Sequence, residues 1–279
     1  MLWKIAADSS CDLPMGMDCA QSVSFVTVPL KLLVDGREFV DDGKLDVREM
    51  MAAMHAFKGA STSACPSPGD WEAEFESADC TIAITMTSAL SGTYNSARVA
   101  RDAVLERHPE KKIHVIDTRS TSGSLILMAK KVNDLIASGL SFEEVVRRAE
   151  EYNRGSTILF TLATFDNLVK TGRMSRIAGM LASNLGIRAV ARNTEEGKIS
   201  VLHKARGESR ILSYLVDKAG KLKDLAHKPV VITHCFNEKA ASKLKAMLEA
   251  AYEGIQVMVL PTRGLTSFYA DDQGILLCI

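Results

Sequence analysis

The sequence carries no excess of charge of either sign. Its 34 lysine and arginine residues balance 34 aspartate and glutamate residues, so the formal net charge at pH 7 is zero. A strongly basic chain would be drawn to nucleic acid or to an anionic membrane by its overall field. We therefore expect no nucleic acid partner, although local basic patches remain compatible with this balance.

Long apolar runs are also missing. No stretch approaches the roughly 18 apolar residues that a membrane-spanning helix needs. The first residues, Met1 to Asp8, lack the basic and then apolar pattern of a secretory signal. We expect a soluble, cytoplasmic protein. Its 279 residues, of which 47% are hydrophobic, suffice for one large or two medium domains.

The six cysteines form no Cys-x-x-Cys pair, and the chain has no glycine-rich nucleotide-binding motif. Cys235 follows His234, but no second pair at ligand spacing accompanies them. We therefore expect neither a disulfide framework nor a metal site, no cofactor, and no phosphate loop for binding ATP.

What the chain does have is a hydroxyl-rich turn. The apolar run Cys80–Thr85 predicts a buried strand, and an apolar stripe from Tyr94 to Val104 predicts a helix. Between them lie hydroxyl-bearing residues and one glycine, namely Thr87, Ser88, Ser91, Gly92 and Thr93. The start of a helix offers free N–H groups and a positive dipole end, which suit a carboxylate or phosphate ester. The alternative is that these hydroxyls merely cap the helix.

The order of expected elements predicts an α/β protein of two domains. Strands and helices alternate up to about residue 155, which favours a mostly parallel sheet covered by helices over residues 1–156. Ser141 and Glu144 have the spacing of a capping box for one of these helices. Residues 157–279 are expected to form an α+β domain that ends in a loop and an apolar strand after Pro261, with the ligand between the domains.

Five segments together resemble the DegV family, the fatty-acid-binding subunit type of bacterial fatty acid kinase. They are Asp8-Ser-Ser-Cys-Asp-Leu-Pro14, Val28-Pro-Leu30, Ser63-Ala-Cys-Pro-Ser-Pro-Gly69, Ser88-Ala-Leu-Ser-Gly-Thr-Tyr-Asn-Ser-Ala97 and Leu168-Val-Lys-Thr-Gly-Arg-Met174. The resemblance implies a protein that binds one long-chain fatty acid between its domains. It also implies a separate kinase subunit that transfers phosphate from ATP to the acid, so that this chain is a carrier and not an enzyme.

The resemblance also implies a site for the lipid carboxylate. Ser91 of the Ser91-Gly92-Thr93 turn would hydrogen-bond the carboxylate, and either Ser63 or Thr62 would assist. Where the family commonly has a histidine near the end of the chain, this sequence has Ser267, with Tyr269 two residues later on the same face if the segment is extended. Either hydroxyl can donate one hydrogen bond, but neither becomes a cation near neutral pH.

The same resemblance places Arg173 at the surface that meets the kinase. We expect the acyl tail to extend into the second domain, and transient membrane contact would allow lipid exchange. Six apolar residues are candidates for lining the tail, although an ordinary core would need them as well: Ile177, Met180, Leu181, Leu185, Ile187 and Val190.

A serine hydrolase acting on a lipid or small ester is the alternative. Ser91 would be its nucleophile, with His114, His203 or His234 as the base. Against this, Leu90-Ser91-Gly92 departs from the Gly-x-Ser-x-Gly elbow, and no oxyanion-hole motif is evident in the sequence.

Overall fold

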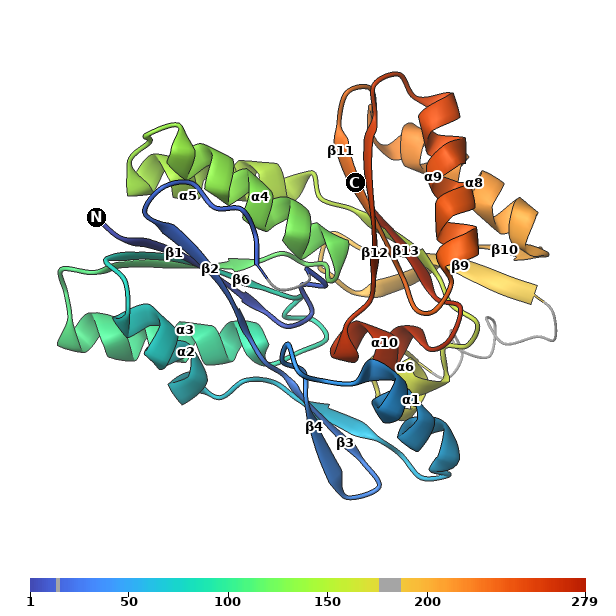
Figure 1. Cartoon of the computed structure of the whole chain (residues 1–279), viewed down its shortest axis with the longest axis horizontal. Helices are drawn as coiled ribbons and strands as arrows, with labels where there is room; N and C mark the ends of the chain where they lie inside the picture. Colours follow the sequence, from blue (N-terminus) through green and yellow to red (C-terminus); the bar gives the residue numbers. More distant parts are fainter. Residues whose placement is uncertain (14–15, 176–186) are drawn as a thin grey trace.

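The computed structural model describes residues 1–13, 16–175 and 187–279, and over these ranges the strands form three sheets (Figure 1). Sheet A is parallel throughout, in the order β2-β1-β6-β7. Its strands are β1 (Trp3–Asp8), β2 (Val23–Val28), β6 (Cys80–Thr85) and β7 (Lys112–Asp117). Such strands are buried on both faces and are therefore almost continuously apolar, as Cys80–Thr85 is in the sequence.

Helices cover both faces of sheet A. On one face α2 (Pro68–Glu76) and α3 (Thr93–Arg107) bury Trp71, Phe75 and Ala97 against the strands. On the other face lie α4 (Gly123–Ala137) and α5 (Phe142–Arg154) (Figure 1). This arrangement confirms the predicted parallel sheet covered by helices.

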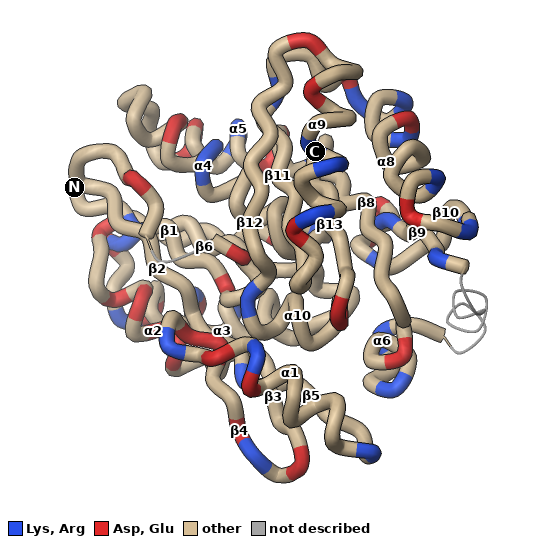
Figure 2. Tube along the Cα trace, turned by 45° about the vertical axis from the view of Figure 1, so that its right-hand side comes forward, with Lys and Arg blue, Asp and Glu red and all other residues tan. Residues whose placement is uncertain are grey.

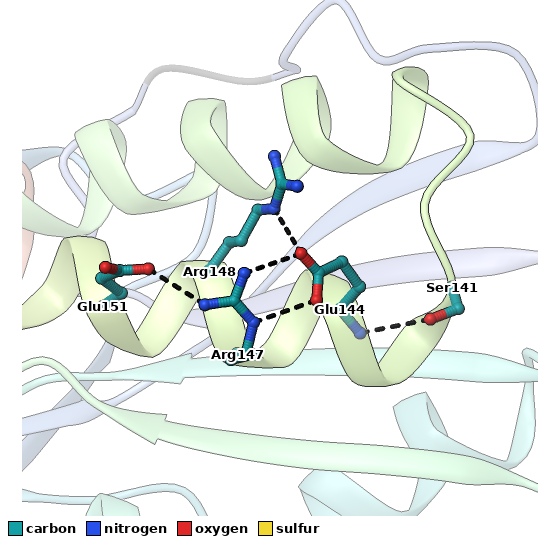
Figure 3. A network of polar contacts seen from close by, with 5 residues as sticks. All are labelled: Ser141, Glu144, Arg147, Arg148 and Glu151. Carbon is teal, nitrogen blue, oxygen red and sulfur yellow. Dashed lines mark hydrogen bonds and ion pairs between the residues drawn. The ribbon is translucent and has the colours of Figure 1, made fainter.

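The capping box predicted at the start of α5 is only half formed. The Ser141 hydroxyl accepts a hydrogen bond from the Glu144 backbone N–H at 3.3 Å, but the Glu144 carboxylate turns to Arg147 and Arg148 (Figure 3). Hydrogen bonds from the two arginines lower the pKa of Glu144 to about 2. Arg147 also forms an ion pair with Glu151, so the exposed charges of this network pair with one another within α5.

A small antiparallel sheet, sheet B, extends from the first part of the chain. Its order is β4-β3-β5, and its strands are β3 (Lys31–Val34), β4 (Arg37–Val40) and β5 (Thr62–Ala64). Asp35 and Gly36 both have positive φ, which is the geometry of the tight hairpin that the Asp-Gly pair predicts. Helix α1 (Val47–Ala56) links the hairpin to β5, the strand that carries Ser63.

Sheet C contains the strands of the second half of the chain, in the order β10-β9-β8-β13-β11-β12. They are β8 (Ile158–Thr161), β9 (Ile187–Asn193), β10 (Ile199–Arg206), β11 (Pro229–His234), β12 (Gln256–Pro261) and β13 (Ile275–Cys278). Only β11 and β12 pair in parallel, so this is the mixed α+β unit that the sequence predicted. Helices α8 (Glu208–Leu222) and α9 (Glu238–Ala251) pack on its outer face.

Helix α4 lies between sheets A and C. It contacts β1 and β6 on one side and β11 and β13 on the other. A side chain at Gly123 would meet Val231 at 2.7 Å, so the helix starts in direct contact with sheet C. One apolar core cluster runs through both halves of the chain. The division at residue 156 therefore stays a prediction.

The segment after Pro261 differs from the prediction of a loop and a strand. A helix, α10 (Gly264–Ala270), precedes β13 and packs against α1, β3 and α6 (Asp166–Lys170). Two aspartates from the first half of the chain fix its start. Asp41 accepts hydrogen bonds from the Gly264 and Leu265 N–H groups at 2.9 Å each, and Asp12 accepts one from Arg263 at 2.7 Å. Helix N-termini are stabilised by such acceptors, which explains a helix in a stretch without strong periodicity.

Candidate functional site

A cavity of about 830 Å³, its mouth included, lies between the two halves of the molecule. It opens where the strands of sheet A end, bounded by the loops after β6 and β7, and it faces the inner surface of sheet C. In the order β2-β1-β6-β7, the chain adds β2 on one side of β1 and then β6 and β7 on the other side. Open α/β sheets bind ligands at the point where the strand order switches in this way.

The walls of the cavity are largely apolar. Strand β8 shows why, because its residues alternate between two faces. Ile158 and Phe160 line the cavity, while Leu159 points to the core beneath α8 and α9. Further apolar lining residues come from both halves of the chain: Leu30, Met86, Leu90, Leu162, Leu168, Ile199, Leu265, Ala270 and Leu276.

Seven hydroxyl-bearing residues line this cavity, and three of them are predicted headgroup residues that come from separate elements. Ser91 lies in the turn before α3, Ser63 in β5 and Tyr269 in α10. The Ser63 Oγ and Tyr269 OH atoms are 2.8 Å apart, and the Ser91 Oγ accepts a 3.3 Å hydrogen bond from the Thr93 N–H. These residues are only partly buried, so their hydroxyls remain open to a ligand. The arrangement brings together neutral donors able to hold one anionic group.

The other predicted headgroup residues do not line the cavity. Thr62 is exposed on β5, Gly92 is the exposed N-cap of α3, and Thr93 is buried as its first residue. Of the two candidates in β5, Ser63 is therefore the one that reaches the cavity.

The structure corrects the predicted position of Ser267. The sequence interpretation placed this residue on the same face as Tyr269, on the assumption of an extended segment. In α10, two residues differ by about 200° around the helix axis. Ser267 is accordingly buried and bonded to the Thr262 hydroxyl at 2.7 Å, while Tyr269 faces the cavity.

Arg173 also lines the cavity, close to the Ser91 turn. Its Nε donates to the Leu90 carbonyl at 3.3 Å and its Nη1 to the Thr171 carbonyl at 2.7 Å. The side chain is partly buried, whereas the sequence interpretation had assigned it only to a docking surface.

The candidates for lining the acyl tail fare differently. Val190 is fully buried on the far face of sheet C, in the cluster that includes Leu159 and Ile211, and is not a cavity residue. Ile187 is partly buried and likewise absent from the cavity wall. The remaining four, Ile177, Met180, Leu181 and Leu185, lie outside the described residues. The sequence interpretation did not name the residues of β8 as part of the cavity wall, although apolar residues alternate at 158, 160 and 162 in the sequence.

Three buried aspartates behind the cavity hold its wall in place. Asp8 accepts hydrogen bonds from the Met86 N–H and from Ser10, and Asp12 and Asp41 hold the start of α10. Burial raises the pKa of Asp8 to about 6 and that of Asp12 to about 7, and it raises the pKa of Asp41 as well. The segment Asp8-Ser-Ser-Cys-Asp-Leu-Pro14, which carries part of the family resemblance, contains two of these aspartates. What the sequence did not reveal is that these carboxylates act on the backbone.

The β9–β10 hairpin closes the cavity from the side of sheet C. The Thr87 hydroxyl donates to the Gly197 carbonyl at 3.0 Å, and the Asn193 amide donates to the Arg119 carbonyl at 3.1 Å. A Cβ at Gly197, where φ is +77°, would lie 2.1 Å from the Thr87 Oγ1 and 3.1 Å from the Arg119 Cα. Only glycine permits this approach.

The geometry does not support the hydrolase alternative. Each candidate base has another partner: His114 contacts Glu150, His203 stacks on Tyr214, and the His234 Nδ1 accepts the Asn237 N–H. Among the described residues, no hydrogen bond joins Ser91 to a histidine.

One group could in principle hold a metal ion within the part of the chain that the structure describes. It consists of His55, Asp271 and Asp272, whose ligand atoms lie within 4.8 Å of one another. The His55 Nε2 and Asp271 Oδ1 atoms are 2.7 Å apart and share a hydrogen bond at the surface.

The comparisons agree with the fold. The model of the DegV family of uncharacterised proteins matches residues 2–275, and the chain belongs to this family. A DegV domain-containing protein of Streptococcus pneumoniae is 42% identical over 277 residues, which cover 99% of this chain and 98% of the relative.

Solved structures of several relatives contain a fatty acid. The fatty acid kinase B3 protein of Streptococcus pneumoniae, loaded with linoleic acid, matches with a TM-score of 0.97 and 42% identity over 100% of this chain and 99% of that one. A DegV family protein from Eubacterium eligens, loaded with heptadecanoic acid, matches with a TM-score of 0.93 and 33% identity over 99% and 98% of the two chains.

The charged residues of both signs are interleaved along the outer helices (Figure 2). Within the described ranges, none of the helices combines the length and apolar character needed to cross a bilayer.

Proposed function

We propose that this protein binds one long-chain fatty acid in the cavity and presents its carboxylate to a separate ATP-dependent kinase. The observation that carries the proposal is the cavity itself, which combines apolar walls with the hydroxyls of Ser63, Ser91 and Tyr269. Relatives with 42% and 33% identity were crystallised with linoleic and heptadecanoic acid, which supports the same class of ligand here.

The acyl tail would supply most of the affinity. Burial of about fourteen methylene groups at about 0.8 kcal/mol each gives roughly 11 kcal/mol of gross transfer free energy, before the costs of ordering. A hydrogen bond to a charged group adds about 1.5–3 kcal/mol. The three hydroxyls therefore mainly fix which end of the lipid faces the mouth. Brief contact with a membrane would allow loading and release.

The carboxylate of the bound acid would be the nucleophile of the kinase reaction. Its oxygen attacks the γ-phosphorus of ATP, a new O–P bond forms, and ADP leaves with the electrons of the broken bond. In this scheme the chain supplies no nucleophile of its own, and Arg173 meets the kinase at the mouth of the cavity.

A coupled assay tests this proposal. Lipid-stripped protein is incubated with palmitate, ATP and a purified fatty acid kinase catalytic subunit, and ADP is measured. We expect ADP only when all components are present, and about tenfold less with Ser91→Ala, because a lost charge-assisted hydrogen bond costs at least that factor. Undiminished turnover with Ser91→Ala would refute the headgroup assignment.

A fluorophosphonate probe distinguishes the carrier from the hydrolase. We expect the protein to remain unlabelled, since no histidine of the described residues is hydrogen-bonded to Ser91. Stoichiometric labelling at Ser91 would support the enzyme instead.

A further inference from the structure

The two hydroxyls of the Ser63–Tyr269 pair come from different parts of the molecule. Ser63 lies in β5 of sheet B, and Tyr269 lies in α10, which precedes β13 of sheet C. A hydrogen bond between two hydroxyls needs about 2.5–3.0 Å between the oxygens, so a shift of about 1 Å would break it. The spacing of this pair therefore depends on how α10 is held against sheet B.

Helix α10 is too short to hold itself in place. It has seven residues, and an isolated helix of that length is not stable in water. At a rise of about 1.5 Å per residue, Tyr269 lies about 7.5 Å along the axis from Gly264, so a shift of the helix start moves the phenol with it. The contacts that fix the start of α10 therefore determine where the Tyr269 hydroxyl lies.

Asp41 joins the start of α10 to sheet B. It directly follows β4, its side chain is buried, and its backbone N–H donates to the Leu30 carbonyl at 2.9 Å. Its two carboxylate oxygens accept the N–H groups of Gly264 and Leu265, one each, at 2.9 Å. A carboxylate that accepts two successive N–H groups fixes both the distance and the orientation of the helix start.

The residue at the start of the helix permits this contact. A Cβ at Gly264 would lie 2.6 Å from the Asp41 Oδ1 and would also meet the Leu45 side chain, so the close approach of the carboxylate needs glycine. Two other side chains bond to the backbone of this segment, Asp12 from the loop after β1 and Asn167 from α6. Among the described residues that do so, Asp41 is the one that directly follows a strand of sheet B.

We propose that Asp41 is a positioning residue of the headgroup site, which sets the Tyr269 hydroxyl against Ser63 so that both can meet the lipid carboxylate. The inference rests on the proposed function. Asp41 is not among the residues that line the cavity, so it acts through α10 and not by contact with the lipid. Donors that are already in place when the ligand arrives bind more tightly, because they do not have to be ordered on binding.

A double-mutant cycle tests this inference with palmitate as the probe. Calorimetry gives the dissociation constant for wild type, Asp41→Asn, Tyr269→Phe and the double variant. Asparagine keeps the shape of the side chain but accepts with only one of its two terminal atoms, so one helix N–H loses its partner. We expect Asp41→Asn to raise the dissociation constant by about three- to tenfold, up to the full loss of the Tyr269 bond. In the Tyr269→Phe protein, which has no hydroxyl to place, the same substitution should change it by less than about twofold.

Two further variants sharpen the result. Asp42→Asn alters the neighbouring aspartate, whose carboxylate accepts the Lys44 N–H at 2.8 Å, and should leave the dissociation constant within about twofold. Gly264→Ala keeps Asp41 and Tyr269 but separates the carboxylate from the helix start. It should weaken palmitate binding as Asp41→Asn does, even if that variant folds poorly.

An equal factor for Asp41→Asn in the wild-type and Tyr269→Phe backgrounds would show a merely structural role and overturn the inference. Undiminished affinity of Asp41→Asn or of Gly264→Ala would overturn it as well. If palmitate did not bind to wild type, the proposed function would fail first, and this inference with it.

Discussion

The hydroxyls of Ser63 and Tyr269 lie 2.8 Å apart, although 206 residues separate them in the sequence. Ser63 belongs to sheet B and Tyr269 to α10, and both line the cavity. The phenol ring of Tyr269 packs edge-on against Phe268, which restricts its position. This pair therefore joins the two halves of the molecule at the place where a headgroup would bind.

Removal of the Tyr269 hydroxyl should weaken carboxylate binding. We expect Tyr269→Phe to raise the dissociation constant for palmitate by about tenfold, because a hydrogen bond to a charged group is lost while the ring remains. Titration with palmitate measures this effect. Tyr214→Phe, on α8 where the ring stacks on His203, is the control and should bind normally. Equal affinity of the Tyr269 variant and wild type would remove Tyr269 from the headgroup site.

Two neighbouring residues of β8 lie on opposite faces of the strand, one in the cavity wall and the other in the core beneath α8 and α9. Ile158→Ala and Leu159→Ala both truncate buried side chains, so each should lower the free energy of unfolding by about 2–5 kcal/mol. Only Ile158 lines the cavity, so only its variant should change the relative affinities for palmitate and stearate. A change of preference in the Leu159 variant, or none in the Ile158 variant, would contradict the assignment of the two faces.

The contact of the β9–β10 turn with Thr87 can be tested at Gly197. Gly197→Ala should destabilise the fold by about 1–2 kcal/mol more than Gly207→Ala does. Both glycines have positive φ, but a Cβ at Gly207 meets nothing within 4 Å, so the difference isolates the steric contact. Thermal unfolding of the two variants measures it, and equal losses would show that the contact is loose.

The buried Asp12 should make stability depend on pH in an unusual direction. Its pKa rises from 3.8 to about 7 because burial disfavours the charged form. Between these values the folded state binds more protons than the unfolded state, so the contribution of Asp12 to stability falls as pH rises from about 4 to 7.

Asp12→Asn removes this titration. Compared with wild type, the variant should therefore gain stability steadily over that interval, as measured by urea unfolding at several pH values. A stability difference between Asp12→Asn and wild type that does not vary with pH would contradict the raised pKa.

Much of this architecture could be predicted because local patterns carry it. The apolar strand Cys80–Thr85 and the Asp35-Gly36 turn identify their elements without tertiary information. Helix α10 could not be predicted in this way. Its start is fixed by Asp12 and Asp41, which are more than 220 residues away in the chain.

The candidate site also combines features that local sequence predicts with features that depend on distant contacts. Ser63 and Ser91 follow from sequence motifs, and the structure brings both to the cavity. The opposite faces of Ser267 and Tyr269 depend on whether the segment is a helix, so the sequence could not separate them. The cavity position of Arg173 depends on the distant Leu90 carbonyl, which no spacing within the motif reveals.

Native mass spectrometry of the freshly purified protein tests the central claim most directly. We predict one added mass in the range of a C16–C18 fatty acid per chain, reduced in occupancy by Tyr269→Phe and identified as a fatty acid after extraction. A protein that carries no such mass, and that takes up none after incubation with palmitate or linoleate, would contradict the account.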